Sequence, residues 1–177
     1  MSSASDKSLI LPIFAMVVVV AASNYLVQFP INDWLTWGAL SYPVAFLITD
    51  LTNRQLGAEK ARRVVVVGFV IAVVASIYLA TPRIAVASGL AFLTAQLLDV
   101  TIFDRMRKMD WWKAPLVSSV LGSIVDTGIF FAAAFAATGL PWVTWALGDL
   151  GVKFVVAMVM LLPFRMAVSM NRSPAAG

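Results

Sequence analysis

The sequence contains no cysteine and no histidine. Without these residues the protein cannot form disulfides, thiolate or imidazole metal sites, or any catalytic scheme that needs a histidine or cysteine. A rhomboid-like serine protease is therefore excluded. Charged residues are also scarce, at 12% of the chain, whereas hydrophobic residues make up 61%. This composition lies far outside that of soluble globular proteins and predicts an integral membrane protein.

The hydrophobic residues are gathered into six segments separated by short loops. A membrane-spanning helix needs about 20 apolar residues, so six spans use roughly 120 residues and leave no room for a soluble domain. We predict an all-α, polytopic integral membrane protein with six transmembrane helices, in which residues 1–177 form a single transmembrane transporter domain. The expected spans cover approximately residues 9–29, 38–52, 64–80, 84–103, 115–137 and 142–162.

The second segment, residues 38–52, is the shortest. It would rise by about 22 Å as a helix, against about 30 Å for the hydrocarbon core. Either residues 34–37 extend it, or it is broken near Pro43 and shielded from lipid by its neighbours. We expect a short second span that is interrupted by proline.

Basic residues alternate between the loops. They precede the first segment and follow the second, fourth and sixth, whereas the opposite loops contain only Arg83. By the positive-inside rule, both termini are expected in the cytoplasm. The net charge of +4 is therefore interpreted as a topology signal, and we expect no nucleic-acid partner. The residues concerned are Lys7, Arg54, Lys60, Arg62, Arg63, Arg105, Arg107, Lys108, Lys113, Arg165 and Arg172.

Four aspartates lie inside apolar segments, namely Asp50, Asp99, Asp126 and Asp149. A carboxylate at the centre of a span costs about 2.5–3.5 kcal/mol on insertion scales, so each of them needs a partner or a function. Lys153 is the one basic residue inside a segment, and it follows Asp149 by four residues, the helical spacing of an ion pair. A structural pair and a contact with solute remain alternatives for these two residues.

Asp50 also precedes a basic residue, Arg54, by four positions. Because Arg54 can extend to the cytoplasm and leave the carboxylate free, we favour a functional Asp50 and assign Arg54 to topology. The surrounding sequence AFLITDL, residues 45–51, is echoed by AFLTAQL, residues 91–97, which aligns Asp50 with Gln96. The echo indicates either similar local packing or two related halves of a site.

The fifth segment has a polar face. Ser119, Gly122, Ser123 and Asp126 occupy positions i, i+3, i+4 and i+7, so they share one side of a helix that must turn away from lipid. A helix-packing seam would explain the serines and the glycine. It would not explain the aspartate, which favours a solute site.

Other segments also present polar faces. Gln96 and Asp99 lie three residues apart, and Asn24 and Gln28 lie four apart. Together with nearby aromatic rings, these groups predict a cavity for a flat heterocycle rich in N–H donors, because carboxylates and carboxamides accept or read such an edge and rings stack on planar solutes. An anionic solute is disfavoured. The aromatic residues nearby in sequence are Phe46, Phe92, Phe130 and Phe131.

Three stretches resemble the signature segments of the vitamin uptake transporter (VUT) family, the queuosine precursor transporters. The resemblance covers about residues 41–162. It implies a multi-pass importer of the bacterial inner (plasma) membrane, with 7-cyano- and 7-aminomethyl-7-deazaguanine as substrates. The stretches are SYPVAFLITDLTNRQLGAEKARR, RIAVASGLAFLTAQLLDVTIFDRMR and WWKAPLVSSVLGSIVDTGIFFAAAF.

The resemblance and the polar faces together define a candidate substrate site. In our hypothesis Asp126 or Asp50 accepts the N1–H and exocyclic amine edge of the base, Gln96 and Asn24 read the remaining edge, and a phenylalanine, Phe130 or Phe92, stacks on the ring. No cofactor, metal or catalytic residue is expected. The full candidate set is Asn24, Tyr42, Thr49, Asp50, Phe92, Gln96, Asp99, Ser119, Asp126, Phe130 and Lys153.

Several alternatives remain. The chain could be the substrate-binding membrane module of an energy-coupling-factor transporter for another small heterocycle or vitamin, or a structural assembly protein. The stretch from Asp50 to Arg63 has a passing likeness to the CDP-alcohol phosphotransferase motif but lacks its aspartate cluster, so an enzyme is not expected. Proton-coupled and facilitated transport are both compatible with the sequence. The expected partners are the substrate and the lipid bilayer, and we favour a homodimer because six spans are few for enclosing a solute.

Overall fold

The computed structural model describes residues 3–26, 29–32, 34–79 and 82–170. These residues form seven helices and one pair of short strands. In chain order the elements are α1 (Ser3–Leu26), β1 (Pro30–Asn32), β2 (Leu35–Thr36), α2 (Trp37–Ser41), α3 (Val44–Leu56), α4 (Ala58–Leu79), α5 (Pro82–Met106), α6 (Lys113–Phe135) and α7 (Trp142–Met170).

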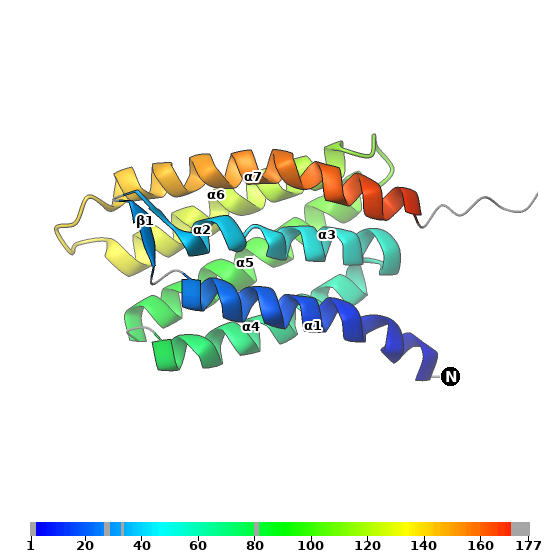
Figure 1. The fold of residues 1–177 in the computed structure, drawn as a ribbon, viewed down its shortest axis with the longest axis horizontal. Coiled ribbons are helices and arrows are strands. Elements are labelled where there is room, and N and C mark those ends of the chain that lie inside the picture. The colour runs from blue at the N-terminus through cyan, green and yellow to red at the C-terminus, as the bar shows by residue number, and fades with distance from the viewer. Residues whose placement is uncertain (1–2, 27–28, 33, 80–81, 171–177) are drawn as a thin grey trace, which may run out of the picture.

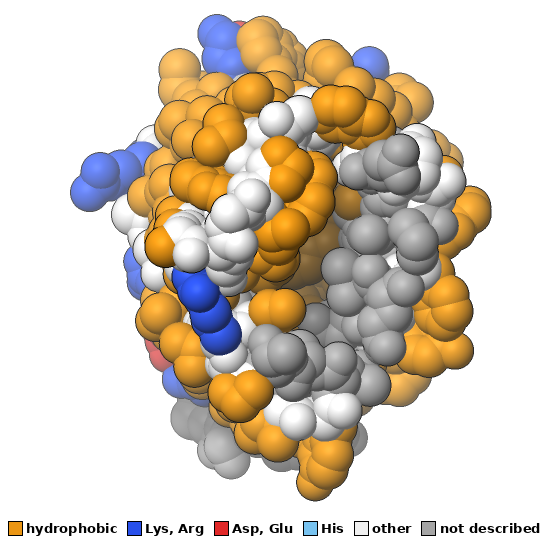
Figure 2. Space-filling view, turned by 90° about the vertical axis from the view of Figure 1, so that its left-hand side faces the viewer, with side chains coloured by type: hydrophobic (Ala, Val, Ile, Leu, Met, Phe, Trp, Pro, Cys, Tyr) orange, Lys and Arg blue, Asp and Glu red, His pale blue; other side chains and the backbone are white. Residues whose placement is uncertain are grey.

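The helices form a bundle of elongated rods that lie side by side (Figure 1). The beginning of α1 and the end of α7 lie at the same end of this bundle. The opposite end carries β1, β2 and the connection from α6 to α7, and Figure 2 looks onto it. Hydrophobic side chains dominate that face and charged side chains are few, as expected for the side that is poor in basic residues.

The structure is that of a helical membrane protein. Within the part of the chain that the structure describes, three helices, α5, α6 and α7, are long and apolar enough to cross a membrane, and α1 contains a shorter apolar stretch, Leu9–Ser23. The all-α prediction missed one small feature, because β1 and β2 pair as antiparallel strands with Pro30 opposite Thr36. Proline prevents this connection from continuing as helix, and strand pairing then satisfies some of its backbone groups.

The second predicted span is interrupted at Tyr42 and Pro43, which separate α2 from α3. The predicted break near the proline is confirmed, whereas the predicted extension by residues 34–37 holds only for Trp37, because residues 35–36 form β2. The 20 residues from Trp37 to Leu56 rise by about 30 Å, enough for the hydrocarbon core. Neighbouring helices surround α3, which packs against α1, α4, α5, α6 and α7. This enclosure allows an interrupted helix with polar side chains to lie inside the membrane.

Close packing of α6 against α3 depends on Gly122. A Cβ atom at this position would lie 2.7 Å from Cε1 of Phe46 on α3. A larger residue would force the Phe46 ring to shift, so the helix-packing alternative for this small-residue face accounts for the glycine. The same approach carries the hydroxyl groups of α6 to the polar side chains of α3.

Two arginines join the ends of α3 and α5. Arg54 donates a hydrogen bond to the backbone carbonyl of Arg107, and Arg107 donates to the carbonyls of Asn53 and Arg54 at 3.0 and 3.2 Å. The last carbonyl groups of a helix have no partner within it and carry partial negative charge, so each arginine caps the other helix. Arg54 therefore points away from Asp50, and its capping role was not predicted.

Candidate functional site

One buried ionic cluster lies between α6 and α7. The ammonium group of Lys153 lies 2.6 Å from Asp149 Oδ2 and 2.7 Å from Asp126 Oδ2, and it donates to Thr127 Oγ1 at 3.0 Å. The side chains of Lys153 and Asp126 are only 6% and 7% exposed. The structural pair of Asp149 and Lys153, one of the two alternatives for these residues, is present, and the lysine also pairs with Asp126 on the neighbouring helix.

Tyr42 connects this cluster to the break between α2 and α3. Its hydroxyl donates to Asp126 Oδ1 at 3.0 Å, and Lys153 Nζ lies 5.4 Å from the centre of its ring. A cation over an aromatic face is stabilised by the ring quadrupole. Both carboxylate oxygens of Asp126 are thus occupied, one by the tyrosine and the other by the lysine.

A second polar cluster lies around Asp50, further along α3 and α6. Ser118 donates to Asp50 Oδ1 at 3.2 Å, and Ser119 donates to Oδ2 at 3.3 Å. Asp99 of α5 is fully buried and lies within hydrogen-bonding reach of Asp50. No basic side chain of the described residues forms an ion pair with either aspartate, in contrast to Asp126 and Asp149.

Hydrogen bonds fix the register of α3 against α5. Thr49 donates to Gln96 Oε1 at 2.7 Å, and Asn53 donates to the carbonyl of Val100 at 2.9 Å. Both contacts join residues 47 positions apart, so the two helices run parallel. The echoed segments 45–51 and 91–97 therefore lie side by side and contribute to one polar layer. The Nε2 group of Gln96 is buried without a hydrogen-bond partner among the described residues.

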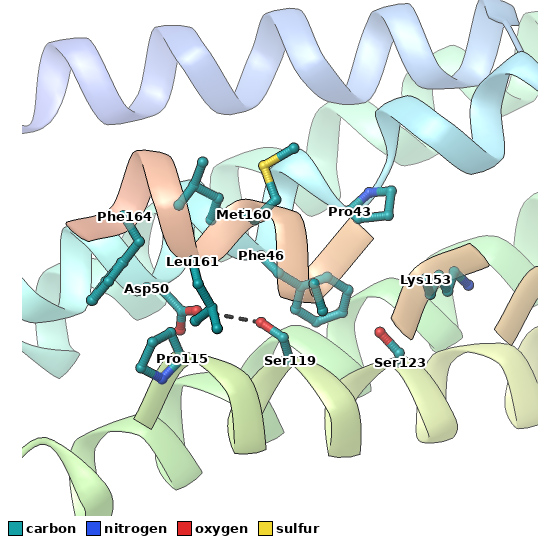
Figure 3. A pocket seen from close by; sticks show the side chains of 12 residues that line it. Pro43, Phe46, Asp50, Pro115, Ser119, Ser123, Lys153, Met160, Leu161 and Phe164 are labelled. Carbon is teal, nitrogen blue, oxygen red and sulfur yellow. Dashed lines mark hydrogen bonds between the residues drawn. The ribbon is translucent and has the colours of Figure 1, made fainter. Parts of the chain in front are cut away.

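A small pocket lies between α3, α6 and α7 (Figure 3). Asp50 and Ser119 lie at one part of it, and Lys153 lies further along. Its cavity volume is about 10 Å³, which is room for about one water molecule. A two-ring heterocycle requires the surrounding helices to separate. The lining residues are Pro43, Phe46, Leu47, Asp50, Pro115, Ser119, Ser123, Lys153, Ala157, Met160, Leu161 and Phe164.

Nine of the eleven predicted site residues fall into three groups. The pocket is lined by Asp50, Ser119 and Lys153, and Tyr42 and Asp126 contact that lysine. A second group lies behind Asp50, away from the pocket lining, and consists of Thr49, Gln96 and Asp99. The side chain of Asn24 lies outside the described part of the chain.

Two predicted aromatic residues, Phe92 and Phe130, do not line the pocket. Phe92 packs in the hydrophobic core beside α1 and α4, and Phe130 packs against other rings of α6. The pocket instead contains Phe46 and Phe164. Phe164 was missed because the sixth segment was predicted to end at residue 162, whereas α7 continues through Pro163. Its only signal in the sequence is the apolar run that resumes after the proline.

Ionisable side chains that converge from several intramembrane helices, face a small pocket and pair with one another are typical of membrane transporters. The chain belongs to the family described as "Putative vitamin uptake transporter", which matches residues 36–81 and 74–168. This membership confirms the predicted resemblance, and the protein is not an enzyme.

Three curated relatives cover most of the chain. The "Probable queuosine precursor transporter" of Haemophilus influenzae is 36% identical over 85% of this chain and 81% of its own. The "Queuosine precursor transporter" of Escherichia coli is 37% identical over 82% of this chain and 79% of its own. A "Probable queuosine precursor transporter" of Bacillus subtilis is 26% identical over 71% and 68%. No solved structure matches the chain.

Proposed function

We propose that the protein imports queuosine precursor bases, 7-cyano- and 7-aminomethyl-7-deazaguanine, across the bacterial inner membrane. The names of the relatives support this substrate class. In the same proposal α2 and α3 together form one span, so that the seven helices make six spans. Both termini are cytoplasmic, at the end of the bundle where the basic helix ends lie. The proposed homodimer remains a prediction from the small size of the chain.

The observation that carries the proposal is the charge balance of the polar layer. Lys153 forms ion pairs with Asp126 and Asp149, and the two negative charges of these aspartates exceed the single positive charge of the lysine. Asp50 faces the pocket and has no cationic partner among the described residues. Such a pocket favours a neutral or cationic solute with paired N–H donors, because a carboxylate accepts two parallel hydrogen bonds from such an edge.

The geometry favours Asp50 over Asp126 as the group that receives the base. Both oxygens of Asp126 are already bound, by Tyr42 and Lys153. Asp50 receives one hydroxyl hydrogen bond at each oxygen, and each carboxylate oxygen has a second lone pair that can accept another donor. In this proposal Asp50 binds the N1–H and exocyclic amine edge of the base, and the aromatic ring of Phe46 or Phe164 stacks on the base.

Uptake by a bacterial strain that cannot synthesise the base tests the proposal. We expect Asp50→Asn to abolish accumulation of labelled 7-cyano-7-deazaguanine, because an amide places a donor against the donor edge of the base. Asp104→Asn is the matched control, since this aspartate lies on α5 at a side-chain exposure of 41%, outside the pocket. Normal uptake by Asp50→Asn, at equal amounts of protein in the membrane, would exclude the assigned site.

A further inference from the structure

Asp50 and Asp99 form a carboxyl pair inside the bundle, one on α3 and one on α5. They are 2% and 0% exposed, and they lie within hydrogen-bonding reach of each other. If Asp50 and Asp99 are both ionised, neither oxygen of Asp99 has a hydrogen-bond partner among the described residues. Ser118 is also close to Asp99, but its single proton is directed to Asp50 or to the carbonyl of Pro115.

The positive charges around the pair are engaged elsewhere. Lys153 of α7 is bound by two other carboxylates, and Arg54 of α3 donates to the end of α5. The other ionisable groups described on these and the packed helices, or directly beside them, are Tyr25 of α1, Tyr42 before α3, Glu59, Lys60, Arg62, Arg63 and Tyr78 of α4, Arg83, Asp104 and Arg105 of α5, Arg107 after α5, Lys113 and Asp126 of α6, and Asp149 and Arg165 of α7.

Two ionised carboxylates at this place would be strongly unfavourable. Each buried charge alone costs several kcal/mol, and two like charges in contact repel each other, so such pairs usually retain a proton. A single proton removes both problems. It neutralises one charge, and the resulting O–H group donates the hydrogen bond that the pair otherwise lacks.

We infer that the Asp50–Asp99 pair is a proton-binding site and that the protein carries one proton inward with each base. This inference rests on the import function proposed above. The two carboxyl groups have different positions, because Asp50 lines the pocket and Asp99 lies behind it. The proton resides on Asp99 and donates to Asp50. Ser118 then donates to the carbonyl of Pro115 at 3.3 Å instead of to Asp50, so one lone pair on each oxygen of Asp50 remains for the N–H edge of the base.

The proton and the base therefore bind together instead of competing. An O–H bond forms on Asp99 with a proton taken from water on the outer side, and it breaks when the proton returns to water on the cytoplasmic side. For a neutral base and one proton, with the membrane potential held at zero, each unit of pH difference supports about tenfold accumulation.

Purified full-length protein in liposomes tests this coupling. The membrane potential is clamped with potassium and valinomycin, and the exterior is made one pH unit more acidic than the interior. We expect about tenfold accumulation of labelled 7-cyano-7-deazaguanine and acidification of the interior, reported by a trapped pH dye, that depends on added base. Exchange of labelled for unlabelled base without a gradient measures the import function separately.

Asp99→Asn separates proton binding from base binding. The amide has nearly the same shape as the acid and still donates to Asp50, so we expect base exchange to persist within about threefold of the unmodified protein. Gradient-driven accumulation and base-dependent acidification should be lost. Asp104→Asn, on the same helix but partly exposed, should retain both.

A readout that needs no substrate is the infrared C=O stretching band of a protonated carboxyl group. We expect this band in the unmodified protein at neutral pH and in Asp104→Asn, and its loss in Asp99→Asn. Absence of the band in the unmodified protein, or base exchange without any base-dependent proton movement, would overturn the proton site. Absence of base exchange would instead overturn the import function and remove the basis for coupling.

Discussion

Replacement of Lys153 by methionine tests the ionic cluster most directly. The substitution removes the only cation of the cluster and retains the length of the side chain. It leaves Asp126 and Asp149 without their positive partner, at side-chain exposures of 7% and 16%. Breaking a buried ion pair by removing one partner costs about 3–5 kcal/mol, and we expect a loss of this size in the free energy of unfolding.

Removal of the facing charge should recover part of this loss. In the double variant Lys153→Met with Asp126→Asn, the carboxylate that contacts Tyr42 is neutral, so less charge is left uncompensated. We expect a coupling energy of at least about 2 kcal/mol between these two substitutions, because residues of one buried network are not additive. Unfolding in mixed micelles, followed by tryptophan fluorescence, measures all four proteins of the cycle.

The exposed pair of Lys113 and Asp110 is a matched control. Its N–O distance is also 2.7 Å, but its side chains are 36% and 62% exposed. Exposed ion pairs contribute about 0–1 kcal/mol, so Lys113→Met should change stability by less than 1 kcal/mol. If Lys153→Met is as mild as this control, or if the cycle shows no coupling, the buried cluster does not stabilise the bundle as reasoned.

Three further predictions concern packing, helix ends and energy supply. Gly122→Ala places a Cβ atom 2.7 Å from the ring of Phe46, and we expect a loss of about 1–3 kcal/mol in stability, measured by the same unfolding assay; unchanged stability would contradict the close approach of α6 and α3. Arg107→Met removes the side-chain donor to the carbonyl of Arg54 and one of the two donors to the carbonyl of Asn53, which keeps the N–H of Gly57. Cleavage by added protease near residue 57 should therefore become faster, by a factor of about 5–10 for a loss of about 1–1.4 kcal/mol; an unchanged cleavage rate would argue against the capping role. Liposomes that contain only this protein should exchange 7-cyano-7-deazaguanine without any ATPase, whereas a strict requirement for an ATPase partner would favour the energy-coupling-factor alternative.

Much of the architecture could be predicted because the signals are local. Apolar segments, the proline in the second one and the alternation of basic residues are all properties of short stretches of sequence. The helical pair of Asp149 and Lys153 was within reach for the same reason, since positions i and i+4 face each other on any helix. The polar face of α6 followed from periodicity, and the packing seam at Gly122 followed from small residues.

The prediction of individual contacts was weaker. Stacking by Phe92 or Phe130 stays a prediction. Neither residue lines the pocket, which contains Phe46 and Phe164, although the ring centre of Phe92 lies 6.3 Å from that of Tyr42. Proximity in sequence to a polar residue does not determine which side of a helix a ring occupies in the bundle. The sixth span was predicted as residues 142–162, whereas the helix α7 continues through Pro163 to Met170, because a helix can continue through proline when neighbouring groups satisfy its backbone.

The sequence by itself therefore determined the class of protein, the approximate spans, their expected orientation and the presence of an unusual number of buried carboxylates. Only the tertiary structure decided which of those carboxylates pair with Lys153 and which lie beside another carboxyl group. Asp126 meets Lys153 across 27 positions, whereas Asp50 meets Ser118 across 68 positions and has Asp99 as its ionisable neighbour. Periodicity within one helix cannot reveal such contacts, because they depend on which helices pack together and in which register. That division separates a neutralised cluster from the carboxyl pair for which we propose proton binding.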